Sequence, residues 1–223
     1  AYSTPDVAQM TFALLLELCL HVGEHSNLVM EGDWTRAKDF SFWNTPLVEL
    51  AGKTMGIIGL GSIGGAVAKI ASALGMRVIA YRGHGEGVEM LPLKEVLAQA
   101  DVLSLHCPLT GETRGMINRE ALAKMKDGAI LINTGRGAVL EEAAVVEALD
   151  SGKLYAVGAD VFSDDPCGRD NPLANHPRCI ATPHVAWTPV ETRDRVIAIG
   201  GENLAAFLAN HPQNVVNAPK PVQ

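Results

Sequence analysis

Short apolar segments of strand length alternate with segments of helical length from residue 54 onward, and this alternation constrains the fold more than any other feature. The segments AILIN and DVLSLH are almost continuously apolar, as expected of strands that are covered on both faces. Strands are expected at residues 54–58, 77–81, 101–106, 129–133, 155–160 and 179–181. This order predicts an α/β fold with a parallel, doubly wound sheet.

A strongly apolar helix is expected from Thr4 to about Val22, and a last helix from Thr188 to roughly Asn210. The polar connection after the first helix contains aromatic side chains, which suggest a surface covered by a partner and favour a homodimer. These side chains are Trp34, Phe40, Phe42 and Trp43.

A glycine-rich loop, Gly59–Gly64, lies between an expected strand and an expected helix. Its first glycine allows a tight turn, Gly61 lets backbone amides approach a pyrophosphate, and Gly64 allows the helix to pack closely on the strand. The helix N-terminus, at Ser62 and Ile63, supplies N–H donors and the positive end of the helix dipole. The loop therefore predicts a Rossmann-type dinucleotide site. The alternative is a tight strand–helix crossing that binds nothing.

Charge, cysteine content and hydropathy exclude several classes of protein. The formal charge of −7 and a pI near 5.5 argue against a nucleic-acid-binding surface. The four cysteines form no CxxC pair, which favours reduced thiols in the cytoplasm over disulfides or a metal site. The most apolar window, TFALLLELCLHV, is too short to span a bilayer and contains Glu17, so no membrane partner is expected.

His21, Glu24 and His25 reproduce the H-x-x-E-H string of some zinc peptidases. Gly23 interrupts the run and no third ligand is apparent, so we interpret it as a helix end with two partly exposed histidines. No metal site is expected.

Several further segments together resemble the cofactor-binding portion of the D-2-hydroxyacid dehydrogenase family. YSTPDVAQMTFALLLEL resembles its interdomain helix, LAGKTMGIIGLGSIG its nucleotide loop, and LHCPLTGETRGMIN its third strand and the turn that follows. INTGRG, GADVFSDDP and TPHVAW resemble the segments that carry its chemistry. The tryptophan of TPHVAW and the segment FALLLELC look most like the glycerate dehydrogenase and hydroxypyruvate (glyoxylate) reductase branch.

The resemblance implies three catalytic residues. His184 would give a proton to the carbonyl oxygen during reduction and take it back during oxidation, which suits an imidazole because it titrates near neutral pH. Arg136 would clamp the substrate carboxylate with its planar, charged fork. Asp165 stands where the family has a glutamate that pairs with the histidine and holds it protonated. Its side chain is one methylene shorter, which places the pairing with His184 in question.

The resemblance also assigns the cofactor pocket. Asp160 matches the carboxylate that holds the nicotinamide amide, Thr134 lines the pocket, and His106 and Pro108 lie near the cofactor. The family usually ends its second strand with an aspartate that accepts hydrogen bonds from the ribose hydroxyls. Arg82 takes that place here; it cannot accept a hydrogen bond but can pair with a 2′-phosphate. The cofactor is therefore expected to be NAD or NADP, with NADP favoured.

The complete protein is expected to be an NAD(P)-dependent oxidoreductase that interconverts hydroxypyruvate, glyoxylate or a similar 2-oxo acid and its D-2-hydroxy acid. Residues 1–200 would form the dinucleotide-binding domain with the interdomain helix. Residues 201–223, with a tail to Pro221, would return to a substrate-binding domain that is largely absent from this chain. The chain alone is then expected to bind dinucleotide and to turn over poorly or not at all. The alternatives are a corepressor-like interaction protein and a bare dinucleotide-binding or dimerisation module.

Overall fold

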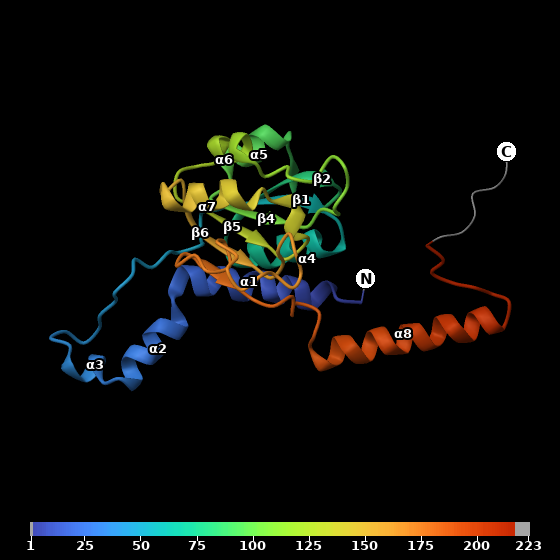
Figure 1. Ribbon diagram of the computed structural model, residues 1–223, viewed down its shortest axis with the longest axis horizontal. Coiled ribbons are helices and arrows are strands. Elements are labelled where there is room, and N and C mark those ends of the chain that lie inside the picture. The colour runs from blue at the N-terminus through green and yellow to red at the C-terminus, as the bar shows by residue number, and fades with distance from the viewer. Residues whose placement is uncertain (1, 217–223) are drawn as a thin grey trace.

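One parallel sheet organises the protein, and the computed structural model describes residues 2–216 of it (Figure 1). The seven strands lie in the order β3-β2-β1-β4-β5-β6-β7, and every neighbouring pair is parallel. Their bounds are Thr54–Leu60 (β1), Arg77–Gly83 (β2), Glu89–Met90 (β3), Val102–Leu105 (β4), Ala129–Asn133 (β5), Leu154–Ala159 (β6) and Cys179–Ala181 (β7). The predicted α/β, doubly wound sheet is confirmed.

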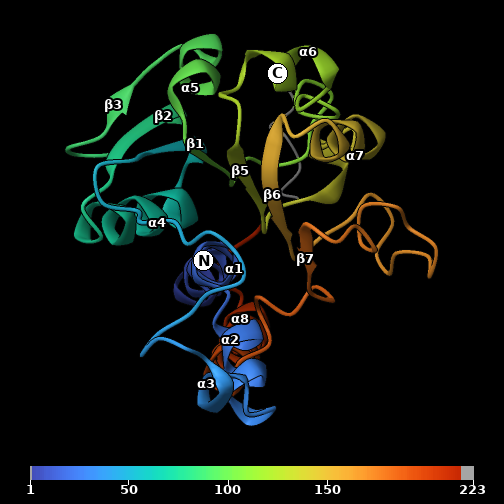
Figure 2. The same ribbon diagram turned by 90° about the vertical axis from the view of Figure 1, so that its left-hand side faces the viewer.

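Helices cover both faces of this sheet (Figure 2). One face carries α5, α6 and α7, and the other carries α1 and α4. The helices are Thr4–Leu20 (α1), Val22–Met30 (α2), Asp33–Arg36 (α3), Ser62–Ala73 (α4), Leu93–Gln99 (α5), Arg119–Lys124 (α6), Glu142–Asp150 (α7) and Val190–Leu208 (α8). In β5, Leu131 packs into one core and Ile130 and Ile132 pack into the other. Burial on both faces is the physical reason for the continuous apolar strands of the sequence.

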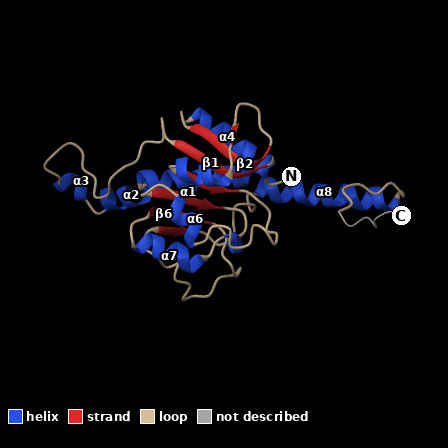
Figure 3. Cartoon of the chain, turned by 90° about the horizontal axis from the view of Figure 1, so that it is seen from above, coloured by secondary structure: helices blue, strands red, loops and turns tan. Residues whose placement is uncertain are grey.

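The connection expected after the first helix is itself partly helical, which corrects the prediction. His21 adopts a left-handed conformation at φ 48° and ends α1, and α2 and α3 follow. We call residues 21–47 the arm; it extends from the sheet in Figures 1 and 3. Neither α2 nor α3 has a buried side chain, and they have only nine and four residues.

The last helix, α8, extends from the opposite end of the molecule (Figure 3). Thr192 is its one buried residue among those described. The domain boundary predicted after residue 200 falls inside this continuous helix, and the tail to Pro221 lies outside the described residues.

No single helix within residues 2–216 is long and apolar enough to cross a membrane. Only α1 and α2 taken together are long and apolar enough, and a bend of 56° separates them.

Candidate active site

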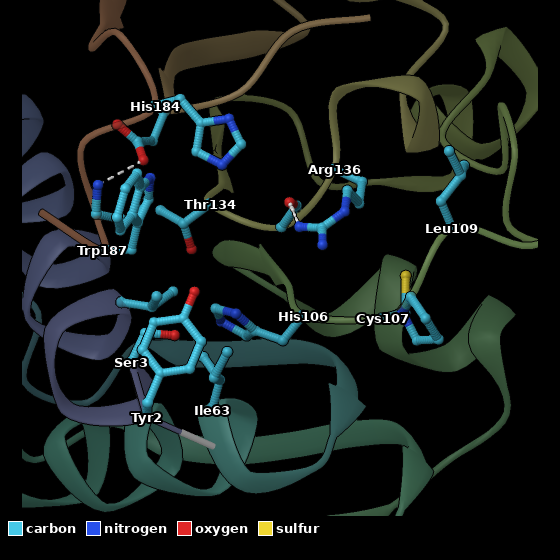
Figure 4. Close-up of a pocket in the computed structure, with 15 residues that line it drawn as sticks. Tyr2, Ser3, Ile63, His106, Cys107, Leu109, Thr134, Arg136, His184 and Trp187 are labelled. Atoms are coloured by element: carbon cyan, nitrogen blue, oxygen red, sulfur yellow. Dashed lines mark hydrogen bonds between the residues drawn. The ribbon is translucent and has the colours of Figure 1, made fainter. Parts of the chain in front are cut away.

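The carboxyl ends of the strands meet at one edge of the sheet, where a cavity of about 680 Å³ opens (Figure 4). Its walls come from the loops after β4, β5, β6 and β7 and from the start of α1 and α4. Doubly wound sheets bind ligands at this edge, beside the point where the strand order reverses. That point lies between β1 and β4 here.

The glycine loop after β1 is shaped by two close backbone contacts and one open position. A Cβ on Gly59 would lie 2.7 Å from the backbone nitrogen of Cys107, and one on Gly64 would lie 2.3 Å from the carbonyl oxygen of Gly59. A Cβ on Gly61 would meet no described atom within 4 Å. The protein's own packing therefore requires the outer glycines, whereas Gly61 leaves space in front of the α4 N-terminus. A pyrophosphate group fits that space.

The loop after β5 carries Arg136 into the cavity wall. The buried amide of Asn133 fixes this loop, because its Nδ2 donates to Arg136 O at 3.0 Å and its Oδ1 accepts from Gly135 N at 3.1 Å. Gly137 follows the arginine because a Cβ there would lie 1.8 Å from the backbone of Phe162. This contact packs the loop of Arg136 against the loop that follows β6.

A buried carboxylate holds the turn that carries His184. Asp160, at the end of β6, is fully buried and accepts from Thr182 Oγ1 at 2.6 Å and from the amides of Val185 and Ala186 at 2.9 Å. These three bonds fix the chain on both sides of His184, which itself adopts a left-handed conformation at φ 55°. Asp160 also lines the cavity.

His184 and Asp165 form a direct pair, with Nδ1 3.0 Å from Oδ2. The shorter aspartate side chain thus reaches the imidazole, and its Oδ1 also accepts from Phe162 N at 3.1 Å. An ionised carboxylate only accepts hydrogen bonds, so the imidazole carries a proton on Nδ1. Nε2 is then the ring nitrogen left for chemistry.

Arg136 and His184 border the same open space, with Thr134 and His106 below them in Figure 4. Thr11 donates its hydroxyl proton to Val7 O at 2.8 Å, so the 3.0 Å contact between the two threonines must be donated by Thr134. Thr134 thereby ties the end of β5 to α1.

His106 lines the cavity and contacts Ser104 Oγ through Nε2 at 2.8 Å. Its Nδ1 is buried and has no hydrogen-bond partner among the described residues. Burial lowers the pKa of His106 to about 4, so the ring is neutral at neutral pH.

Arg82 lies outside this cavity, at the end of β2, where an adenosine ribose would bind. Its Nη2 pairs with Glu112 Oε2 at 2.6 Å, and its Nε donates to Tyr81 OH at 3.2 Å. The hydrogen bond with Glu112 is the largest cause of the raised pKa of Arg82.

The predicted site residues therefore lie in four neighbouring places. Seven line the cavity: Ile63, His106, Pro108, Thr134, Arg136, Asp160 and His184. Gly59, Gly61, Ser62 and Gly64 form the adjoining loop, Asp165 pairs with His184 from behind, and Arg82 lies further along the crevice. The sequence-based prediction missed Glu112 beside Arg82 and eight residues of the lining: Tyr2, Ser3, Val7, Cys107, Leu109, Gly135, Ala186 and Trp187. All of these residues lie within the motifs that carry the family resemblance, but none was among the predicted site residues.

Within the described part of the chain, no group of three or more His, Cys, Asp or Glu side chains could hold a metal ion. His25 Nδ1 contacts His21 O at 2.8 Å, so the H-x-x-E-H string is engaged in local helix contacts. The four cysteines are all free.

The sheet order, the open glycine loop and the cavity at the carboxyl ends are those of a dinucleotide-binding domain. A family model described as "D-isomer specific 2-hydroxyacid dehydrogenase, NAD binding domain" matches residues 12–186. The chain belongs to this family, and it is an NAD-binding domain of the D-2-hydroxyacid dehydrogenases.

Individual relatives agree with this assignment. A hydroxypyruvate reductase from Blautia hydrogenotrophica is 50% identical over 222 residues, which cover 97% of this chain and 69% of that protein. D-lactate dehydrogenase from Aquifex aeolicus, solved with NAD and lactic acid, has a TM-score of 0.84 and 32% identity, covering 95% of this chain and 68% of that one. An acyclic imino acid reductase, Bsp5, solved with NADPH and D-Arg, has a TM-score of 0.86 and 30% identity. The match covers 97% of this chain and 69% of that one.

Proposed function

We propose that this domain serves a reductase that converts hydroxypyruvate, or a similarly small 2-oxo acid such as glyoxylate, into its D-2-hydroxy acid. The observation that carries the proposal is that Arg136 and His184 border one cavity beside the open glycine loop, with Asp165 paired to His184 from behind. The relative named hydroxypyruvate reductase supports the choice of substrate. A corepressor or a bare binding module would need neither the pair nor the arginine.

Each catalytic residue has a role that follows from its contacts. The nicotinamide, when bound, supplies the hydride in reduction and accepts it in oxidation. Arg136 Nη1 donates to Gly135 O at 2.8 Å, while Nε and Nη2 have no partner among the described residues. Those free donors would bind the substrate carboxylate and polarise its carbonyl.

His184 would move the proton. With Asp165 holding Nδ1–H, a protonated imidazole presents Nε2–H to the substrate. As the new C–H bond forms at the carbonyl carbon, that proton passes from Nε2 to the carbonyl oxygen and leaves a neutral imidazole. Oxidation of the alcohol returns the proton to Nε2.

The exposure of this pair supports our proposal that a second domain covers the cavity. The side chains of His184 and Asp165 are 43% and 34% exposed, whereas hydride transfer requires a site closed to water. The α8 helix carries an exposed apolar stripe at intervals of seven, seven and four residues: Val190, Ile197, Leu204 and Leu208. We therefore assign α8, including residues after 200, to the contact with a substrate-binding domain.

The cofactor, assembly and location follow from other features. Arg82 favours NADPH because a guanidinium pairs with a 2′-phosphate. The exposed aromatics of the arm favour a homodimer, and the free cysteines favour the cytoplasm.

The proton-transfer role is tested with two substitutions in the protein that carries this chain. His184→Gln should lower kcat for NADPH-dependent reduction of hydroxypyruvate by about a hundred- to ten-thousandfold, with the Kd for NADPH unchanged. Asp165→Asn should lower kcat and alter its pH profile, and Asp165→Glu should restore most of the rate because the charge returns. Full activity of His184→Gln would overturn the proposal, as would a loss confined to dinucleotide binding.

A further inference from the structure

An ion pair crosses the nucleotide crevice at the end away from the catalytic cavity. Arg82 ends β2 and Glu112 lies in the turn after β4, and these strands flank β1 on its two sides. Their side chains meet at 2.6 Å, between Nη2 and Oε2. The pair therefore spans the region above the end of β1, from which the glycine loop begins.

Close backbone packing holds both flanking loops at this place. A Cβ on Gly83, next to Arg82, would lie 2.4 Å from Leu60 O, and one on Gly59 would lie 2.7 Å from Cys107 N. This packing places the ends of β2 and β4 on either side of the end of β1, and the exposed side chains of Arg82 and Glu112 meet between them. Their distance in the sequence, thirty residues, hides this relation.

Two nitrogens of the Arg82 guanidinium have hydrogen-bond partners, and the third has none among the described residues. Tyr81 OH accepts from Nε at 3.2 Å, and the guanidinium carbon lies 5.3 Å from the centre of the Tyr81 ring. Glu112 takes Nη2, whereas Nη1 has no partner within the described residues. One edge of the fork can thus bind a phosphate while Glu112 stays beside it.

Glu112 changes the relative affinity of this site for a ribose with a 2′-phosphate and a ribose without one. A 2′-phosphate carries about −1.5 to −2 charges near neutral pH, so a carboxylate paired with the same guanidinium repels it. The hydroxyls of an unphosphorylated ribose donate hydrogen bonds, and a carboxylate accepts them. Glu112 therefore offers the acceptor that the family's second-strand aspartate would supply and that Arg82 cannot.

We propose that Glu112 is a specificity-determining residue, which opposes the 2′-phosphate of NADPH and favours the free ribose of NADH. The preference between the two dinucleotides is then set by the Arg82–Glu112 pair and not by Arg82 alone. This inference rests on the proposed role of Arg82 at the adenosine ribose.

The test is a titration of the purified chain with NADPH and NADH, before and after Glu112→Gln. The ratio Kd(NADH)/Kd(NADPH) should rise about fivefold, as expected when one exposed charge interaction is removed. Glu120→Gln is the matched control, because Glu120 is also exposed and ion-paired, at 2.6 Å to Lys124, but lies on α6. It should leave the ratio unchanged.

The possible failures are distinguishable. A ratio that Glu112→Gln leaves within twofold, while both dinucleotides still bind, overturns this inference alone. Arg82→Asp should reverse the preference toward NADH, and an unchanged ratio there removes the assigned role of Arg82 and the inference with it. Absence of binding by either dinucleotide to the unsubstituted chain would instead defeat the proposed function.

Discussion

Gly61 differs from the two glycines that flank it in the reason for its presence. Gly59 and Gly64 are required by contacts inside the protein, whereas the space at Gly61 is filled by no described atom. Its backbone, at φ −91° and ψ −156°, is also accessible to alanine. The fold itself would accept a side chain at Gly61, so the reason for a glycine is its position at the N-cap of α4, where a pyrophosphate would approach the backbone.

Gly61→Ala should therefore separate binding from stability. The methyl group would occupy the space of the ligand and raise the Kd for NADH and NADPH at least about tenfold, which corresponds to 1.4 kcal/mol. The cost in the free energy of unfolding should stay within about 1 kcal/mol, mainly from the weaker helix cap. Gly65→Ala, with equally open space, is the control and should bind normally. Unaltered affinity in Gly61→Ala would show that no ligand occupies this position.

His106 links stability to pH. Its folded-state pKa of about 4 lies below the ordinary value of 6.5, so between these values the unfolded chain takes up a proton that the folded chain does not. The free energy of unfolding should consequently fall by about 1–3 kcal/mol as the pH drops from 6.5 to 4. Urea denaturation across this range should show the fall, and His106→Gln should reduce it. If the free energy of unfolding fell equally with pH in the unsubstituted protein and in His106→Gln, the fall would not come from His106.

At the scale of elements, the convergence of the site was predictable from the sequence. Arg136, Asp165 and His184 each follow a strand, and those strands are the neighbours β5, β6 and β7. Because the strands are parallel, their carboxyl ends meet at one edge, so order along the chain indicates proximity in space. The family resemblance supplied the roles, and the topology supplies the reason that the three residues can act together.

The loops between elements were less predictable, because their conformations depend on contacts distant in the sequence. The reach of Asp165 to His184 depends on Asp160, whose three hydrogen bonds place the turn on which the imidazole stands. Glu112 likewise reaches Arg82 only because the fold places the loop after β4 near the end of β2. No local pattern encodes either distance.

At the scale of the whole molecule, two projecting elements flank the sheet and leave apolar side chains in solvent. The arm was interpreted as a polar connection, but it contains two short helices, neither of which has a buried side chain. The aromatic residues that drew attention in the sequence are nonetheless the exposed ones, with Phe40 at 91% and Trp43 at 64%. Aromatic side chains in this state are typical of interface anchors.

The arm should therefore hold the proposed homodimer together. Replacing both Phe40 and Trp43 by serine should weaken dimerisation by about 2 kcal/mol or more, roughly thirtyfold in Kd, as expected when interface anchors are removed. Sedimentation equilibrium over a range of concentrations measures this change directly. Met90→Ser is the control, because Met90 is also an exposed apolar residue, at 40%, but lies on the edge strand β3. A protein that is monomeric before substitution, or a dimer that only Met90→Ser disrupts, would show that the arm serves another contact.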